Sequence, residues 1–210
     1  MLIGDAEVWV DRFRGFDDRF MDRIAALWPV CVEMLGPQPT EDTITINLVD
    51  RLCVDPVVRR LCHYVAYQQE PFGLAPDGTK YSKGKIDIAV LFDWERERYL
   101  AYECKRLNVI GTNGRSSLAS AYVAEGMMRF ITEQYAQDLP LGCMLGYVMD
   151  GDTAFARQQL TMAIVNHGPL ALFDGPTSTP SVGAHPRFET RHARLGGRDI
   201  NLRHTLLIYA

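Results

Sequence analysis

Three consecutive segments decide the fold: Ile86-Asp-Ile-Ala-Val-Leu-Phe92, Asp93-Trp-Glu-Arg-Glu97 and Arg98-Tyr-Leu-Ala-Tyr-Glu-Cys-Lys-Arg-Leu107. Two apolar runs rich in β-prone residues, joined by a short polar segment, are typical of a β-hairpin. A turn symmetric about Glu95 pairs Phe92 with Arg98, and the same register places Asp87 directly opposite Glu103. The stretch therefore predicts two adjacent antiparallel strands on which two acids face each other.

The two faces of this hairpin differ in character. Side chains alternate between the faces of a strand, so Glu103 and Lys105 point to one side and Cys104 to the other. Cross-strand partners stand about 4.5–5.5 Å apart at Cβ, so Asp87 joins Glu103 and Lys105 on one face. The opposite face is apolar: Ile86, Ile88, Val90, Phe92, Leu100, Tyr102 and Cys104. We therefore expect the Cys104 side chain to be buried behind the polar cluster.

This polar cluster has the parts of a metal site. Two carboxylates held close together raise each other's pKa unless a cation lies between them. Mg²⁺ prefers hard oxygen ligands, which Asp87, Glu103 and the backbone carbonyl of Cys104 supply. Lys105 beside the metal would orient or help deprotonate an attacking water, or stabilise the charge that develops on a phosphate. These parts suit the hydrolysis of a phosphodiester bond.

The spacing of the cluster resembles a known signature. Asp87, followed 16 positions later by Glu103-Cys104-Lys105 on the next strand, is similar to the PD-(D/E)xK motif of restriction-endonuclease-like nucleases, with Ile86 in place of the proline. Residues 40–150 also follow the order of that superfamily: an acidic helix, the hairpin, a long helix and a buried strand.

The resemblance implies a fold, a cofactor and a substrate. The fold class is α/β, a restriction-endonuclease-like three-layer core with a mixed central β-sheet flanked by helices. The cofactor is Mg²⁺, for which Mn²⁺ substitutes, and the substrate is DNA, in a bacterial or phage defence or restriction system. Asp87 and Glu103 become metal ligands and Lys105 the catalytic lysine. Target choice would come from a homodimer or a larger protein complex.

Such sites are often completed by an acid on the helix before the sheet. Glu41 and Asp42 are the candidates, with Glu70 as a rival. Glu41 and Asp42 equally fit the first turn of a helix, where the dipole favours negative charge. For Asp87, Glu103 and Lys105 the alternative is a cross-strand ladder of salt bridges on a solvated face.

The cations are unevenly distributed along the chain. All four lysines, three of which precede Asp87, lie between Lys80 and Lys105, and residues 1–50 hold ten acids against four arginines. The formal net charge of −4 therefore does not exclude a DNA substrate. The candidate nucleic-acid contacts are Lys80, Lys83, Lys85, Arg106 and Arg115, although the three lysines equally suit an exposed, solubilising loop.

Other arginines allow two interpretations. Arg129 and Arg115 bracket the helix after the hairpin and either face the scissile phosphate or pair with a neighbouring acid such as Glu125 or Glu133. The C-terminal arginines form either a second basic surface or an ordinary solvated face: Arg187, Arg191, Arg194, Arg198 and Arg203.

Hydrophobic periodicity predicts the remaining elements. A first helix carries Phe13, Phe16, Phe20, Ile24 and Leu27; Thr40 caps a second helix with Ile44, Leu48 and Leu52; and Asp55-Pro56 begins a third through Leu61 and Val65. Residues 68–83 read as a loop or a short irregular strand. Further on we expect a helix from Ser116 or Ser117 to near Pro140, a strand over 143–149, a helix from Asp152 through Val165, a loop over 174–186 and a strand over 200–209.

We interpret the chain as a single nuclease-like domain over 1–210, with an N-terminal helical extension over 1–38, a core over 40–150 and a C-terminal helix and strands over 151–210. Five cysteines without paired spacing, and an N-terminus without a basic, apolar leader, predict a cytoplasmic protein without membrane contact.

The leading hypothesis is a Mg²⁺-dependent nuclease. The alternatives are an inactive subunit of the same fold that binds nucleic acid or supports assembly, and an ordinary α/β domain with structural hairpin charges.

Overall fold

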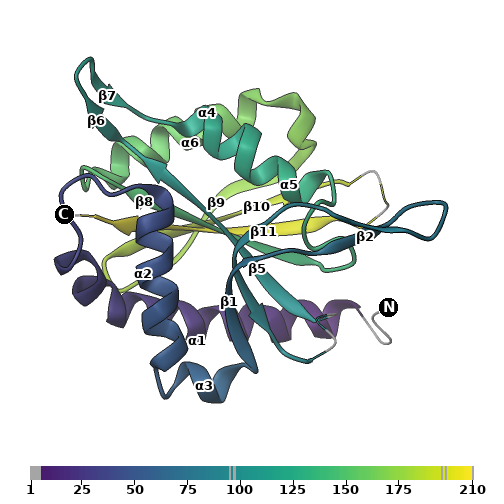
Figure 1. Cartoon of the computed structure of the whole chain (residues 1–210). Helices are drawn as coiled ribbons and strands as arrows, with labels where there is room; N and C mark the ends of the chain where they lie inside the picture. Colours follow the sequence, from purple (N-terminus) through teal and green to yellow (C-terminus); the bar gives the residue numbers. More distant parts are fainter. Residues whose placement is uncertain (1–5, 95, 97, 195, 197, 210) are drawn as a thin grey trace.

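A seven-stranded mixed sheet forms the centre of the molecule (Figure 1). The computed structural model describes residues 6–94, 96, 98–194, 196 and 198–209. In spatial order the strands are β1 (Tyr64–Gln69), β4 (Ile86–Leu91), β5 (Tyr99–Leu107), β8 (Leu141–Val148), β11 (Ile200–Ile208), β10 (His185–His192) and β9 (Leu172–Val182). The pairs β5–β8 and β8–β11 are parallel and the others antiparallel.

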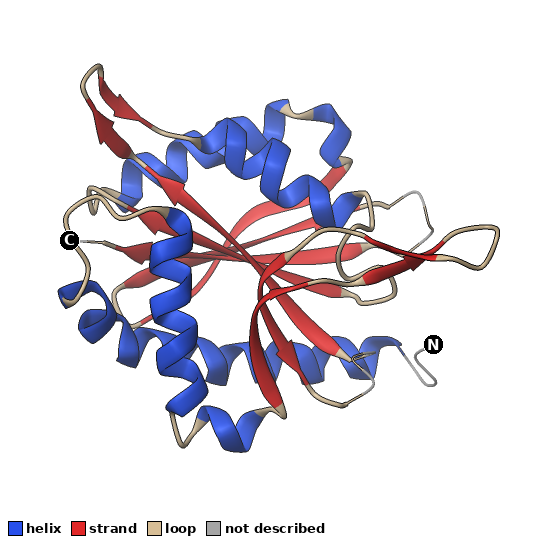
Figure 2. Cartoon of the chain, viewed as in Figure 1, coloured by secondary structure: helices blue, strands red, loops and turns tan. Residues whose placement is uncertain are grey.

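Helices cover both faces of this sheet (Figure 2). One face carries α1 (Ala6–Glu33), α2 (Glu41–Val54) and the single turn α3 (Val58–Leu61). The other carries α6 (Thr153–Asn166) and a continuous helical segment made of α4 (Ala119–Ala121), the π-helical η1 (Tyr122–Met127) and α5 (Met128–Ile131). A short 3₁₀ turn, η2 (Gly168–Leu170), follows α6. The chain is thus an α/β protein with a mixed central sheet, as the sequence predicted.

Two small hairpins extend from the sheet. One pairs β2 (Phe72–Leu74) with β3 (Lys80–Ser82), and the other pairs β6 (Val109–Gly111) with β7 (Gly114–Ser116). They point away from the sheet on opposite sides of the molecule (Figure 1).

The first two helices form as the apolar spacing predicts. Phe20 of α1 is fully buried and its ring lies 5.3 Å from that of Tyr102 on β5. Trp28, rather than the half-buried Leu27, completes the stripe and stacks on Tyr147 of β8. Thr40 caps α2, because its hydroxyl oxygen accepts a hydrogen bond from the amide of Thr43 at 3.2 Å.

The predicted hairpin register is confirmed as far as Ile88, while the predicted Asp87↔Glu103 pair lies beyond the end of the ladder. Strands β4 and β5 pair from Leu91↔Tyr99 to Ile88↔Tyr102, and the Phe92 amide donates to the Arg98 carbonyl at 3.0 Å. The predicted turn centre, Glu95, lies outside the described residues. The strand β8, the Asp152-capped helix α6 and the terminal strand β11 are also confirmed.

Two expectations around the core's first strand are wrong or incomplete. The third helix stops at Leu61, and Val65 lies on β1. Residues 64–69 form a strand because pairing with β4 satisfies their backbone hydrogen-bonding groups. Residues 68–83, expected as a loop or a short irregular strand, contain two short strands, β2 and β3, that pair as a hairpin.

Two further expectations fail in the second half of the chain. The helix after the hairpin ends at Ile131, well before Pro140, and changes to π-helical geometry in the middle. Residues 174–182 lie on β9 and residues 185–186 on β10, with only a two-residue turn between them, where a loop was expected. The prolines are tolerated because β9 is an edge strand, where a proline removes no needed hydrogen bond, and because the β9–β10 register shifts beside Pro186.

The C-terminal arginines do not form one basic surface. Arg187, Arg194 and Arg203 are buried, at 6–7% exposure, and bind acids or backbone carbonyls. Among the helices of the described residues, none is long and apolar enough to cross a membrane.

Candidate functional site

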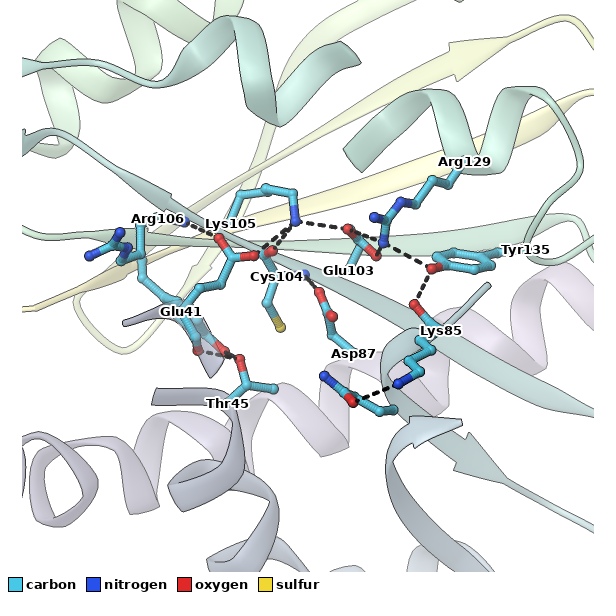
Figure 3. Close-up of polar contacts among 12 residues, drawn as sticks. Glu41, Thr45, Lys85, Asp87, Glu103, Cys104, Lys105, Arg106, Arg129 and Tyr135 are labelled. Carbon is cyan, nitrogen blue, oxygen red and sulfur yellow. Dashed lines mark hydrogen bonds and ion pairs between the residues drawn. The ribbon is translucent and has the colours of Figure 1, made fainter. Parts of the chain in front are cut away.

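The candidate site lies where β4 and β5 separate. The backbone ladder between them runs as far as Ile88↔Tyr102. Beyond that point two amides of β5 donate to carboxylates: Cys104 N to Asp87 Oδ2 at 2.7 Å, and Arg106 N to Glu41 Oε2 at 2.9 Å (Figure 3). The separation therefore admits one acid from β4 and one from the first turn of α2 to the edge of β5.

Lys105 connects Glu41 to Glu103. Its Nζ lies 2.9 Å from Glu41 Oε1 and 2.9 Å from Glu103 Oε1, and it donates to the Cys104 carbonyl at 2.9 Å. Arg129 Nη1, from α5, lies 2.8 and 3.0 Å from the two oxygens of Glu103, which is fully buried. We call these five residues the Glu103 network: Glu41, Asp87, Glu103, Lys105 and Arg129 (Figure 3).

A second layer holds Arg129 in place. The hydroxyl of Tyr135 accepts a hydrogen bond from Arg129 Nη1 at 2.9 Å and donates to the carbonyl of Lys85. Gly126, in the π-helical turn, lies close to the network: a Cβ there would be in ordinary contact, at 3.5 Å, with the Cγ atoms of Glu103 and Lys105, but only 2.7 Å from Met144 Cε. π-Helical turns occur frequently at functional sites.

Burial and like charge set the protonation of the network. Burial raises the pKa of Asp87 to about 6, although the Cys104 amide and Lys105 oppose the shift. Burial, followed by the charge of Asp87, raises the pKa of Glu103 to about 7 against the opposing effect of Lys105 and Arg129. Burial disfavours the Lys105 ammonium, but Glu103 and Glu41 outweigh it and raise its pKa. Lys105 is therefore a cation at neutral pH. The three carboxylates of the network still outnumber its two cationic side chains.

The structure distinguishes between the predicted upstream acids. Glu41 joins the network through Lys105 and the Arg106 amide. Asp42, the next residue along the helix, is exposed. Glu70 is half-buried just after β1, where its carbonyl accepts from the Gln69 amide at 3.2 Å. Cys104, as expected, has a fully buried side chain.

The predicted nucleic-acid contacts do not form one cluster. Lys80 is exposed on β3, and Lys85 Nζ lies 3.5 Å from Gln68 Oε1. Lys83 Nζ donates to the carbonyl of Glu133 at 3.4 Å and to the Gln137 side chain. Arg106 donates to the Pro39 carbonyl at 3.1 Å.

Arg115 is not a bare cation. Its Nη1 lies 2.9 Å from Asp150 Oδ2 and 2.9 Å from Asp152 Oδ2, and its guanidinium lies over the Phe155 ring at 3.6 Å. These contacts attach the β6–β7 hairpin to the start of α6.

Sequence reasoning missed the partner of Arg129. The local spacing suggested Glu125 or Glu133, whereas the carboxylate it binds is Glu103, 26 positions earlier. Tyr135 was also missed. No short sequence pattern identifies either contact, because both depend on the orientation that the π-helical turn gives to α5.

The oxygen donors of the network suit a hard divalent cation. Within the described ranges no group of three or more His, Cys, Asp or Glu side chains is arranged to hold a metal ion, and Lys105 Nζ lies between Glu41 and Glu103. The network nevertheless combines three carboxylates with two cations. Among the residues that the structure describes, none donates a hydrogen bond to Asp87 Oδ1. The donor atoms present, carboxylate and carbonyl oxygen, are of the kind that Mg²⁺ prefers.

No family model, curated protein or solved structure matched this chain. The assignment of a function therefore rests on the geometry and the charge of the Glu103 network.

Proposed function

We propose that this protein is a divalent-metal-dependent nuclease that hydrolyses DNA phosphodiester bonds, with Asp87, Glu103 and Lys105 at the reacting centre. One observation carries the proposal. At the separation of two strands, carboxylates from α2 and β5 bind one lysine, and a third carboxylate, from β4, accepts from the adjacent Cys104 amide; only two cations of the network balance them. Buried carboxylates with raised pKa values at a strand end are a frequent mark of a functional site.

The order of elements supports the same proposal. The helix α2, the antiparallel strands β1, β4 and β5, the helical segment α4–α5 and the parallel strand β8 follow one another along the chain. This order is similar to the core of restriction-endonuclease-like proteins, so we extend the proposal to that three-layer fold. The proposed setting, a bacterial or phage defence or restriction system, follows from the resemblance alone.

The metal ligands in this proposal are Asp87, Glu103 and the Cys104 carbonyl, with Glu41 completing the set. When bound, Mg²⁺ supplies Lewis acidity toward a phosphate oxygen and lowers the pKa of a coordinated water. Arg129 and Tyr135 hold the Glu103 carboxylate in a fixed orientation, so its oxygens are positioned before a metal or substrate arrives.

Lys105 acts as a cation rather than as a base. Its raised pKa keeps the ammonium charged at neutral pH, and its side chain is 12% exposed. An ammonium in this environment stabilises negative charge that develops on a phosphate oxygen. It would also hold the carboxylates together while no metal is bound.

Cleavage of DNA by the purified protein tests the proposal. We expect cleavage with Mg²⁺ or Mn²⁺ and none in excess chelator. Lys105→Ala and Glu103→Ala should each lower the rate by at least about a hundredfold. Arg60→Ala, which removes an exposed cation of α3 outside the network and outside the candidate nucleic-acid contacts, is the matched control and should retain cleavage. Folding of every variant is checked by thermal melting, and wild-type rates in both folded network variants would overturn the site.

One observation favours a second candidate, a non-catalytic member of the same fold that binds nucleic acid. Lys105 and Arg129 already engage both oxygens of Glu103, as they would in a purely structural network. Calorimetry separates the two functions. Affinity for Mg²⁺ or Mn²⁺ that is lost in Glu103→Gln supports the nuclease, whereas DNA binding without any affinity for either metal supports the second candidate.

A further inference from the structure

A cleft of about 630 Å³ is lined by residues outside the Glu103 network. One wall is the β2–β3 hairpin, with Phe72, Leu74 and Tyr81, and the other is the segment 132–137, with Gln134 and Gln137. The volume lies in the range of pockets that hold small ligands. The cleft therefore has room for a ligand of the size of a nucleotide.

Tyr81 provides a supported aromatic surface in this cleft. It pairs across the hairpin with Gly73, and its ring rests on that glycine: a Cβ added to Gly73 would lie 2.3 Å from Tyr81 Cζ. The residue is still 52% exposed. The neighbouring Phe72 and Leu74 are 61% and 69% exposed. The hairpin thus presents apolar surface to solvent beside a polar wall.

The cleft also carries groups that suit a phosphate and a base edge. Lys83 Nζ donates to the Glu133 carbonyl and to the Gln137 side chain, and an ammonium has three N–H donors, so one remains. The Glu133 carboxylate lies 3.8 Å from Nε of the buried Arg194, which offsets its charge. The amide of Gln134 offers both a donor and an acceptor.

Both walls lead directly into the Glu103 network. Strand β3 ends at Ser82 and the chain runs on through Lys85 into β4, which carries Asp87, whereas the segment 132–137 follows α5, which carries Arg129. Tyr135 joins the two walls, since its hydroxyl contacts both Arg129 Nη1 and the Lys85 carbonyl. The cleft is therefore connected to the network by two short stretches of chain and by the Tyr135 contacts.

We infer that this cleft binds an unpaired nucleotide of the DNA substrate, with its base stacked on Tyr81 and its phosphate near Lys83. The identity of the ligand as DNA rests on the proposed function. A paired base inside a duplex is already stacked on both faces, so an aromatic platform selects single-stranded or frayed DNA. The protein should then prefer unpaired strands to continuous duplex.

Fluorescence anisotropy with short labelled oligonucleotides tests this inference. The buffer contains chelator, so binding is measured without cleavage. We expect tighter binding of single-stranded DNA than of blunt duplex, and about tenfold weaker single-strand binding by Tyr81→Ala. Tyr81→Trp should retain affinity because it keeps the aromatic face. Trp94→Ala is the matched control, since Trp94 is 82% exposed beyond the opposite end of β4.

The possible outcomes distinguish a failure of the cleft proposal from a failure of the nuclease proposal. Wild-type affinity in both Tyr81→Ala and Lys83→Ala, each shown to be folded, would overturn the cleft, even if the wild-type protein cleaves DNA. Equal binding of duplex and single strands, or tighter binding of an RNA strand of the same sequence, would also overturn it. Loss of single-strand binding in Tyr81→Ala, in a protein that never cleaves, would support the cleft while the nuclease proposal fails.

Discussion

Two buried polar networks lie on opposite faces of β5, and neighbouring residues of that strand contact them. Glu103 belongs to the network described above, and the hydroxyl of Tyr102 donates to Asp17 Oδ1 of α1 at 2.8 Å. We call this second group the Asp17 network: Arg14, Asp17, Asp18, Arg187, Glu189 and Arg203. The same residue types therefore occur on both sides of one strand.

The difference between the networks is their charge balance. In the Asp17 network three carboxylates meet three guanidinium groups, and both oxygens of the buried Asp17 are occupied, Oδ1 by Tyr102 and Oδ2 by Arg187 and Arg203. In the Glu103 network three carboxylates meet two cations. A balanced network attaches α1 to the sheet, whereas the unbalanced one is suited to gain a further cation.

The largest expected effect is on stability, from Asp17→Asn. The substitution leaves the buried guanidinium groups of Arg187 and Arg203 short of a countercharge, which costs about 3–5 kcal/mol in the free energy of unfolding. Urea denaturation measures the change. Asp18→Asn is the control and should cost less, because the Asp18 side chain is 54% exposed. A loss below about 1 kcal/mol in Asp17→Asn would remove the structural role from this network.

The second prediction compares the cleavage rates of Lys105→Ala and Asp17→Asn. Lys105→Ala should lower the rate by at least about a hundredfold, equivalent to about 2.7 kcal/mol in the activation barrier. Asp17→Asn, measured at a temperature where it is folded, should cleave at close to the wild-type rate. Equal losses of rate in the two variants would contradict the division between a structural and a functional network.

The pH dependence of stability should differ between wild type and Glu103→Gln. The folded protein binds a proton at Glu103 more tightly than the unfolded chain, because the pKa is raised to about 7. Without metal, this carboxyl therefore makes the wild type more stable as pH falls from about 7 toward the ordinary glutamate pKa, by at most about 1.4 kcal/mol per pH unit. Glu103→Gln lacks that contribution. Urea titrations in chelator between pH 8 and 5 measure it, and parallel curves for the two proteins would refute the shift.

Arg129→Ala should give a smaller, pH-dependent loss. Arg129 lowers the pKa of Glu103, so its removal raises that pKa further and leaves less of the carboxylate ionised at pH 7. We expect cleavage to fall about tenfold at pH 7 and to recover partly at higher pH, since one pKa unit corresponds to a tenfold change in ionisation. Arg129→Lys should preserve part of the activity. A pH–rate profile with an unchanged acidic limb would exclude this positioning role.

Arg115→Ala should have the smallest effect on DNA binding. The guanidinium is already paired with Asp150 and Asp152, so its loss releases no phosphate contact. The salt dependence of DNA affinity should stay the same, because its slope counts the phosphates neutralised by free cations. A clearly shallower slope in Arg115→Ala would show that the β6–β7 hairpin contacts DNA.

The sequence was sufficient for the features that depend on local periodicity. Alternation along 86–107 predicted the register of β4 and β5 from Leu91↔Tyr99 to Ile88↔Tyr102, and the Thr40 cap placed Glu41 in the first turn of a helix. The choice of Glu41 over Asp42 was beyond the sequence, because adjacent helical residues point about 100° apart and the helix orientation decides which one reaches β5.

Features that depend on long-range packing were not predictable. The Asp17 network joins α1 to strands about 170 residues later, so Arg187 and Arg203 looked like surface cations in the sequence. Strand β9 looked like a loop because proline and glycine signal turns locally, while its place at the edge of the sheet is a property of the whole fold. Arg129 contacts Glu103 because a π-helical turn precedes α5, and no sequence pattern predicts that turn.

The central claim is that the Glu103 network binds a divalent metal ion. A crystal structure of the protein soaked with Mn²⁺, with anomalous data, tests it most directly. We predict an anomalous peak within coordination distance of carboxylate oxygens of both Asp87 and Glu103, and none in crystals of Glu103→Gln treated in the same way. No peak at saturating Mn²⁺, with Lys105 Nζ still bridging Glu41 and Glu103, would contradict the claim.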